Sequence, residues 1–221
     1  MRKKLVAMAC CSLAVSTPVS AATVFDPVDD FLPSYTGPQI GELNVTSFSV
    51  VFDPASSIFT IGGTLAGAID PGTGGFYAIG VDTGAGAIAP FGSIGQPNVT
   101  FDQVVVVAGA GDAFVGADDL DFTISGNTFS VLVPLALLPS TGADPLGYGF
   151  NLWPRTDLDP ANLPAISDFA PDNALLNPTA VPEPSTWLML LAGFGLIGSV
   201  LRSARRQRLA VSSGWRQGRQ A

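Results

Sequence analysis

In residues 122–133, FTISGNTFSVLV, apolar and polar side chains alternate on both sides of a short polar turn. Alternate residues of a strand point to the same face of a sheet, so each arm directs its apolar residues to one side. The turn, Ser125-Gly126-Asn127, contains residue types that favour tight hairpins. This stretch therefore predicts a β-hairpin with one buried face. The residues expected on that face are Phe122, Ile124, Phe129, Val131 and Val133.

The same alternation recurs through the middle of the chain, where each apolar segment is bounded by Gly, Pro, Asn or Asp. The 25 Gly and 18 Pro among 221 residues also favour many turns. We therefore expect residues 23–175 to form an all-β domain, an antiparallel β-sandwich of jelly-roll or Ig-like topology. Val104–Val107 should be a central strand that is buried on both faces. The other expected strands are Thr46–Phe52, Ser57–Leu65, Phe76–Val81, Val99–Val107, Leu120–Ile124, Asn127–Val133 and Gly147–Trp153.

Charge is segregated along the sequence. The formal net charge is −8, yet residues 23–182 hold 17 acidic residues and a single basic one, Arg155. Such an acidic domain is repelled by nucleic acid, so we expect no nucleic-acid partner. The same residues contain no Cys, His or Lys. Ser-His-Asp and Cys-His nucleophiles and His/Cys zinc sites are therefore excluded from the domain.

The first 22 residues are typical of a secretion signal. The basic segment Arg2-Lys3-Lys4 precedes the apolar run Leu5–Val15, and the small residues of Val19-Ser20-Ala21 follow. The apolar run is shorter than the about 20 residues that a membrane-spanning helix needs. We expect cleavage after Ala21 or Ala22, and export through the general secretion machinery.

A second apolar segment, residues 185–201, contains no charged residue and predicts a single transmembrane helix. Trp187 is placed as an interfacial aromatic, and basic residues follow the segment. By the positive-inside rule, the tail 202–221 is cytoplasmic and the acidic domain lies outside the inner membrane. The Pro-rich residues 176–184 are expected to form a stalk between the two. The flanking basic residues are Arg202, Arg205, Arg206 and Arg208.

The residues around this segment resemble a PEP-CTERM sorting signal. Val181, Pro182, Glu183, Pro184 and Ser185 precede the apolar segment, and the arginines follow it in the order of such signals. The resemblance covers residues 181–208, and residues 209–221 form a longer tail than is usual. Prolines remove amide donors and hold the chain extended, which suits a peptidase that binds an extended strand.

This resemblance implies that the partner is an exosortase, an integral-membrane thiol peptidase that recognises the Pro-Glu-Pro neighbourhood and removes or exchanges the helix. It also implies a Gram-negative envelope, a final place at the cell surface or in the extracellular matrix, and an association with exopolysaccharide or biofilm.

Aromatic residues of the domain are candidate glycan contacts. Tyr77, Tyr148 and Trp153, together with Phe150, could form a platform on which sugar rings stack. The alternative is that aromatic residues at strand spacing belong to the core.

Four acidic residues crowd a short Gly-containing stretch and are candidate calcium ligands, because carboxylate oxygens are the ligands that calcium prefers. Their spacing does not fit an EF-hand loop, so a solvated acidic loop is the alternative. No other cofactor is expected. The four residues are Asp112, Asp118, Asp119 and Asp121.

Only carboxylate chemistry remains open to an enzyme. Asp82-Thr83-Gly84 resembles the active-site loop of aspartic peptidases, but a second copy is absent. Arg155 either neutralises a buried carboxylate or holds an acidic ligand. We expect a non-enzymatic surface or matrix protein; the alternatives are a glycan-binding module for exopolysaccharide and a carboxylate-dependent glycosidase.

Overall fold

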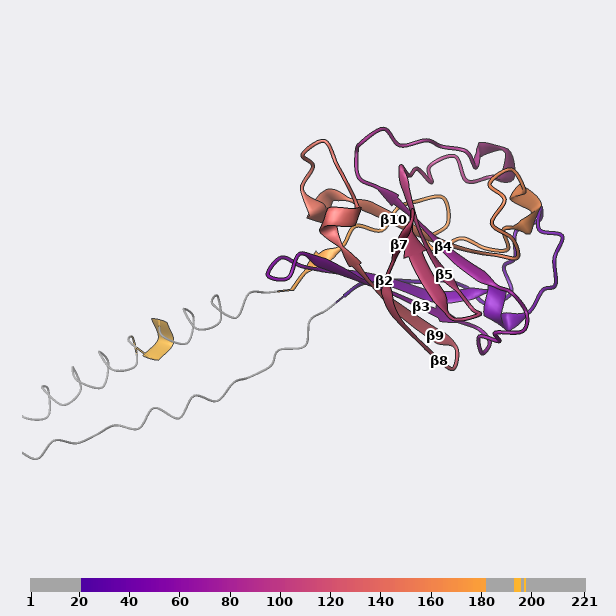
Figure 1. Ribbon diagram of the computed structural model, residues 1–221, viewed down its shortest axis with the longest axis horizontal. Coiled ribbons are helices and arrows are strands. Elements are labelled where there is room, and N and C mark those ends of the chain that lie inside the picture. Colours follow the sequence, from indigo (N-terminus) through magenta and orange to yellow (C-terminus); the bar gives the residue numbers. More distant parts are fainter. Residues whose placement is uncertain (1–20, 182–192, 196, 198–221) are drawn as a thin grey trace, which may run out of the picture.

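The computed structural model describes residues 21–181, 193–195 and 197. These residues form β-strands joined by loops and by short 3₁₀ helices (Figure 1). The strands are β1 (Ala22–Phe25), β2 (Val45–Asp53), β3 (Ile58–Leu65), β4 (Phe76–Asp82), β5 (Gln103–Ala108), β6 (Asp112–Val115), β7 (Asp118–Asp119), β8 (Asp121–Ser125), β9 (Thr128–Pro134), β10 (Gly149–Arg155) and β11 (Thr179–Ala180). The 3₁₀ helices are η1 (Gly41–Leu43), η2 (Gly92–Ile94), η3 (Leu135–Leu137), η4 (Pro145–Gly147) and η5 (Leu163–Ala165).

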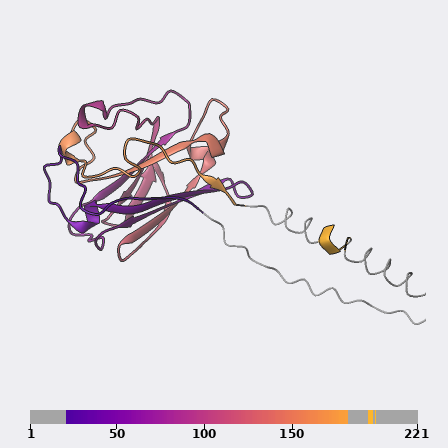
Figure 2. The same cartoon turned by 180° about the vertical axis from the view of Figure 1, so that it is seen from behind.

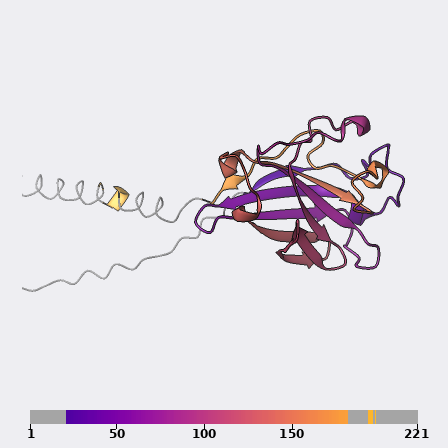
Figure 3. The ribbon, with the colours of Figure 1, turned by 45° about the horizontal axis from the view of Figure 1, so that its top comes forward.

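The strands make two sheets that are stacked on each other. The first sheet has the order β1-β2-β3-β9-β8, with β11 also paired to β2, and the second has the order β10-β4-β5-β6-β7. All of these pairings are antiparallel except that of β11 with β2. Figure 3 shows the strands of the two sheets as separate layers. The expected all-β, antiparallel fold is confirmed.

The main core lies between the two sheets and follows from the period of two in each strand. In β9, Phe129, Val131 and Val133 are buried, while Leu132 between them is 39% exposed. Ser125 pairs with Thr128, and Gly126 has a φ of +60° in the turn that joins β8 to β9. The hairpin expected from residues 122–133 is therefore confirmed.

The second sheet is covered on both faces. In β5, Val105 and Val107 face the main core, whereas Val106 is 5% exposed and points to the other side. A second apolar cluster covers that side and comes from loops rather than from a third sheet. The four consecutive valines thus report a strand with two buried faces, as expected. Residues of this second cluster are Leu32, Tyr35, Leu43, Ala78, Phe91, Val99, Trp153, Ile166 and Phe169.

Most strand boundaries agree with the sequence pattern to within two residues, but the one expected at Val99 is wrong. Residues 99–102 precede β5, which begins at Gln103. Val99 is fully buried in the second cluster, where it packs without belonging to a strand. An apolar residue that is buried under a loop gives the same signal as one in a strand. The pattern also missed the short strands β1, β6, β7 and β11.

The first and last strands lie end to end along β2. β1 pairs with Ser47–Val50, and β11 pairs with the next residues, Val51 and Phe52. Figure 2 shows these two strands at the same end of the domain. The expected boundary at residue 175 is corrected, because Leu176 exchanges backbone hydrogen bonds with Phe150 and residues 179–180 belong to a sheet. Within the stalk expected over 176–184, the described residues 176–181 are part of the folded domain.

The transmembrane helix expected over residues 185–201 lies largely outside the described residues. Gly193–Gly195 and Ile197 are helical. Among the residues that the structure describes, no helix is long and apolar enough to cross a membrane.

Candidate functional site

The candidate sorting site begins where the sheet ends. The Val181 amide donates a hydrogen bond to the Phe52 carbonyl at 2.9 Å, directly after β11. Val181 is the first residue of the resemblance to a sorting signal. Pro182, which follows, has no amide hydrogen and cannot donate to β2 in turn. The run of amide donors to β2 therefore ends at Val181, just before the Pro-Glu-Pro motif.

The expected signal-peptide junction lies beside this site. The Ala22 amide donates to the Thr179 hydroxyl at 2.9 Å, which joins the start of β1 to the start of β11. The expected cleavage after Ala21 or Ala22 would leave the new N-terminus next to the last strand. The other residues of the expected sorting signal, Pro182, Glu183, Pro184, Ser185, Trp187, Arg202, Arg205, Arg206 and Arg208, lie outside the described residues.

The glycan platform expected from aromatic residues is wrong. Tyr77 and Phe150 are 0% exposed, and Tyr148 and Trp153 are each 2% exposed. Tyr148 stacks on Phe59 in the main core with ring centroids 5.7 Å apart. Trp153 lies in the second cluster, in contact with the rings of Phe91, Phe101 and Phe169. The faces that would stack on a sugar already contact other side chains, so the core alternative is the correct one.

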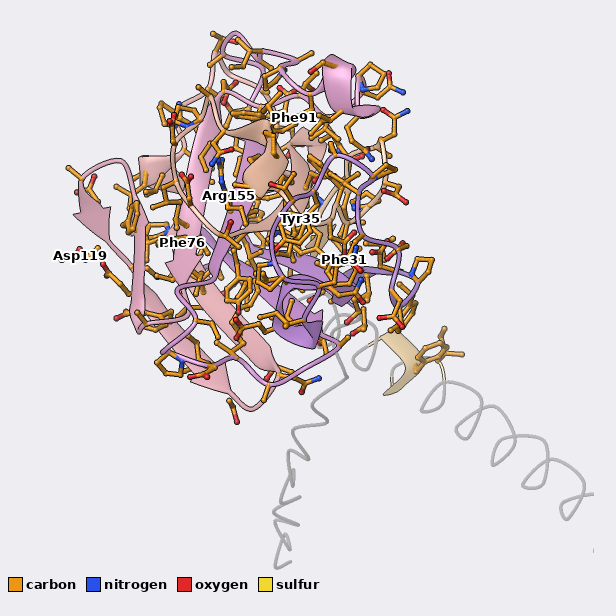
Figure 4. All side chains as sticks on the ribbon, turned by 90° about the vertical axis from the view of Figure 1, so that its right-hand side faces the viewer. Phe31, Tyr35, Phe76, Phe91, Asp119 and Arg155 are labelled. Atoms are coloured by element: carbon orange, nitrogen blue, oxygen red, sulfur yellow. The ribbon has the colours of Figure 1, made fainter. Side chains whose placement is uncertain are left out.

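The calcium site expected at Asp112, Asp118, Asp119 and Asp121 does not assemble. All four residues are exposed, and they are spread over β6, β7 and the start of β8. In the antiparallel register Asp119 pairs with Phe114, and Asp118 pairs with Val115. Figure 4 shows Asp119 at the outer edge of the domain. These carboxylates fit the solvated acidic segment that was the alternative.

A different group of carboxylates does come together. Asp26, Asp30 and Asp172 each place a carboxylate oxygen within 4.8 Å of the others. Asp26 follows β1, and Asp172 lies in the segment between η5 and β11. Neither oxygen of Asp26 accepts a hydrogen bond from a described residue, and its Oδ2 is fully buried. Oxygen ligands of this kind suit a hard cation such as calcium.

Burial together with the charges of neighbouring carboxylates makes Asp26 and Asp168 weaker acids than usual. Burial and the charges of Asp168, Asp30 and Asp172 raise the pKa of Asp26 to about 8. Burial likewise raises the pKa of Asp168 to about 7, although that carboxylate accepts hydrogen bonds from the amides of Val45 and Phe169. The sequence analysis did not predict this group, because Asp172 lies far along the chain from Asp26 and Asp30 and the three residues share no motif.

The loop that resembled an aspartic peptidase makes a turn. The Asp82 carboxylate accepts hydrogen bonds from the Gly84 amide at 3.0 Å and from the Thr100 hydroxyl at 2.6 Å. The Thr83 hydroxyl donates to Asp102. Asp82 therefore serves its own loop, where Gly84 has a φ of +77°.

Comparison with known proteins identifies one segment of the chain. A family model described as "PEP-CTERM protein-sorting motif" matches residues 180–206. No curated protein matches the chain, and no solved structure does. The match begins at Ala180, the last residue of β11. The resemblance recognised from Val181 to Arg208 is thereby confirmed.

Proposed function

Starting from a chain that carries a PEP-CTERM sorting signal, we propose that it is a non-enzymatic protein of the cell surface or extracellular matrix, processed by an exosortase. The signal makes the chain an exported exosortase target that is associated with a membrane before processing. The matrix placement, and an association with exopolysaccharide or biofilm, belong to the proposal. The observation that carries it is the match over residues 180–206.

The position of the signal relative to the fold supports this proposal. The Val181 amide is still bonded to β2, and Pro182 is the next residue. A peptidase that binds the Pro-Glu-Pro neighbourhood would therefore work directly beside the folded domain. Release at this point would leave β11 in its sheet and the domain intact.

The arrangement of the two ends also supports it. Because β1 and β11 lie end to end on β2, the secretion signal and the sorting signal are attached to the same end of the domain. Both segments could then occupy one membrane while the acidic domain stays on its outer side. The net charge of −16 over residues 23–182 would repel an anionic lipid surface and favour a domain that stands clear of it.

The strand order favours the Ig-like alternative for the topology. The order β2-β3-β9-β8 corresponds to A-B-E-D of an Ig-like sandwich, and β10-β4-β5-β6 corresponds to F-C-C′-C″. The segment after η5 takes the place of strand G, because Ile166, Ala170 and Leu176 form antiparallel bridges to β10. Sandwiches of this kind are common in cell-surface domains, which agrees with the proposed location.

The glycan-binding alternative has lost the observation that favoured it, because Tyr77, Tyr148 and Trp153 are buried. The glycosidase alternative requires two facing carboxylates across an open site. In the acidic group at Asp26, Asp30 and Asp172 the Oδ2 of Asp26 is fully buried, which does not fit an open site.

Processing can be tested in a Gram-negative host that expresses the full chain with or without an exosortase. The proposal predicts a shorter, released form only when the exosortase is present. The double variant Pro182→Ala/Pro184→Ala should stay unprocessed and membrane-bound, because its chain regains two amide donors and loses its fixed extended shape. Pro54→Ala, which changes an exposed proline in the turn between β2 and β3, is the matched control and should be processed normally.

Equal processing of the wild type and the double variant would contradict recognition of the motif. Equal processing with and without the exosortase would contradict the proposed partner.

A further inference from the structure

A groove of about 510 Å³ lies on the outer face of the second sheet, the side away from the main core. Its floor is formed by side chains of β4, β5 and β6, among them Ala78, Val106 and Phe114. Loop residues form the rims. Ile88 is 59% exposed and Leu158 is 39% exposed, so two large apolar side chains border the opening. A groove of this composition favours an apolar occupant.

Arg155 lines the same groove and is 6% exposed. It is the only Lys or Arg among the described residues. Figure 4 shows it on the side of the domain that carries Phe91, a further lining residue. A buried cation is expected to have an anionic partner, because burial removes its hydration.

No described carboxylate forms an ion pair with Arg155, although the charges of Asp157 and Asp159 act on it through space. Nη2 donates to the carbonyls of Asp159 at 2.5 Å and Asn162 at 3.3 Å, which are neutral acceptors. Nε is fully buried with no acceptor, and no ion pair joins the guanidinium to a described carboxylate. Nη1 makes no hydrogen bond and, unlike Nε, is not sealed from the surface. Burial lowers the pKa of Arg155, and the charges of Asp157 and Asp159 offset this effect only in part.

The carboxylates of Asp157 and Asp159 form hydrogen bonds within their own loop and none to the guanidinium. The Asp157 carboxylate accepts hydrogen bonds from the Asp159 amide and the Asn162 side chain, each at 2.5 Å. The Asp159 carboxylate accepts from the Ala161 amide at 3.0 Å. These bonds fold the loop after β10 on itself and leave the guanidinium to the backbone carbonyls. The sequence left two partners open for Arg155, a carboxylate of the domain or an acidic ligand. These contacts favour the ligand.

We propose that this groove binds a small apolar molecule that carries one carboxylate, with the carboxylate at Arg155 and the apolar body between Ile88 and Leu158. A single cation matches a single negative charge, and a guanidinium suits a carboxylate. A polyanion would be opposed by the 17 acidic residues of the surrounding domain. The proposal is independent of the sorting signal and of its processing.

The test uses the full chain in lipid nanodiscs, with the heat of binding to empty nanodiscs subtracted. The probe is naphthalene-2-acetate, and its neutral counterpart is naphthalene-2-acetamide. We expect saturable binding of the carboxylate at one site, at least about tenfold tighter than binding of the amide, because a charge-assisted pair forms at a buried arginine.

Two variants and one control locate the site. Arg155→Gln removes the charge while keeping an amide donor for the carbonyls, and should remove the preference for the carboxylate. Ile88→Glu adds a negative charge at an exposed rim position, so it spares the fold, and should weaken carboxylate binding by about tenfold or more. Leu132→Glu makes the same kind of change at an exposed position on β9 of the other sheet and should bind like the wild type.

Equal affinity for the carboxylate and the amide would overturn the proposal. So would binding that Ile88→Glu leaves unchanged, or binding that Leu132→Glu weakens as much as Ile88→Glu does. Since Ile88→Glu changes only a rim side chain, loss of folding in Arg155→Gln would still leave a decisive variant.

Discussion

The acidic group around Asp26 makes the stability of the domain depend on pH in an unusual direction. The pKa of Asp26 is raised from 3.8 to about 8, so the folded protein holds a proton that the unfolded chain releases. Between those two values the unfolded state binds fewer protons, and the free energy of unfolding falls as the pH rises. Above about pH 8 the carboxylate is ionised in both states and the loss is complete. Asp168, with a pKa raised to about 7, acts in the same direction.

The size of the effect follows from the shift after a correction for solvent. Each pKa unit corresponds to about 1.4 kcal/mol, but Asp26 is only half-buried and water screens part of the repulsion. We therefore expect ionisation of Asp26 to lower the free energy of unfolding by about 1–3 kcal/mol at pH 8 relative to pH 4. The variant Asp26→Asn imitates the protonated form and gives up no hydrogen bond, since no described donor reaches the carboxylate. It should be more stable than the wild type at pH 8 by about the same 1–3 kcal/mol.

Chemical denaturation of the purified protein from pH 4.5 to 8.5 measures this difference. The buffer contains a chelator, because a cation held by Asp26, Asp30 and Asp172 would itself relieve the repulsion and flatten the pH dependence. Asp121→Asn removes an exposed carboxylate on β8 and serves as the matched control, with little expected change. An Asp26→Asn variant that is no more stable than the wild type at pH 8 would contradict the buried, protonated Asp26, as would wild-type stability that rises from pH 5 to 8.

Three further substitutions test the packing. Gly80→Ala should destabilise the domain by about 1–3 kcal/mol, because a Cβ at this position would overlap the Trp153 ring. Gly92→Ala is the control in the same denaturation assay, because its Cβ would have its nearest neighbour 4.0 Å away. Ile61→Ala should cost about 2–5 kcal/mol, since Ile61 is fully buried between the sheets, whereas Leu132→Ala on the exposed face should change stability by less than about 0.5 kcal/mol. Asn151→Leu should lower the free energy of unfolding by about 1–3 kcal/mol in a thermal assay. The Nδ2 of the buried Asn151 donates to the carbonyls of Pro171 and Ala174, at 2.6 and 2.9 Å, and Leu cannot replace either bond. A neutral effect of any of these three changes would contradict the contacts described for that residue.

The fold class was predictable because alternation in a strand is a local property. The hairpin of residues 122–133 carries its turn and both apolar faces within one short stretch, and the structure agrees with it. The four valines of β5 reported burial on both faces in the same way. β1 and β11 were missed because each is stabilised by pairing with β2, a contact between distant parts of the chain.

The same difference between local patterns and distant contacts decides which candidate sites could be predicted. The sorting signal is a contiguous segment that is defined by the order of its residues, so sequence alone was enough to recognise it. The aromatic residues failed as a platform because a strand pattern does not say whether a loop covers its outer face, and here the second cluster covers Trp153. The acidic group at Asp26 and the groove at Arg155 are made by residues that only the folded chain brings together.

The intact mass of the mature protein, isolated from its envelope and growth medium, shows whether the chain is cut at both ends. We expect a chain that starts at Ala22 or Thr23 and has lost the residues that follow the Pro-Glu-Pro neighbourhood, with any added group attached to the new C-terminus. A mature protein that still begins at Met1, or whose mass includes the full tail to Ala221, would contradict it.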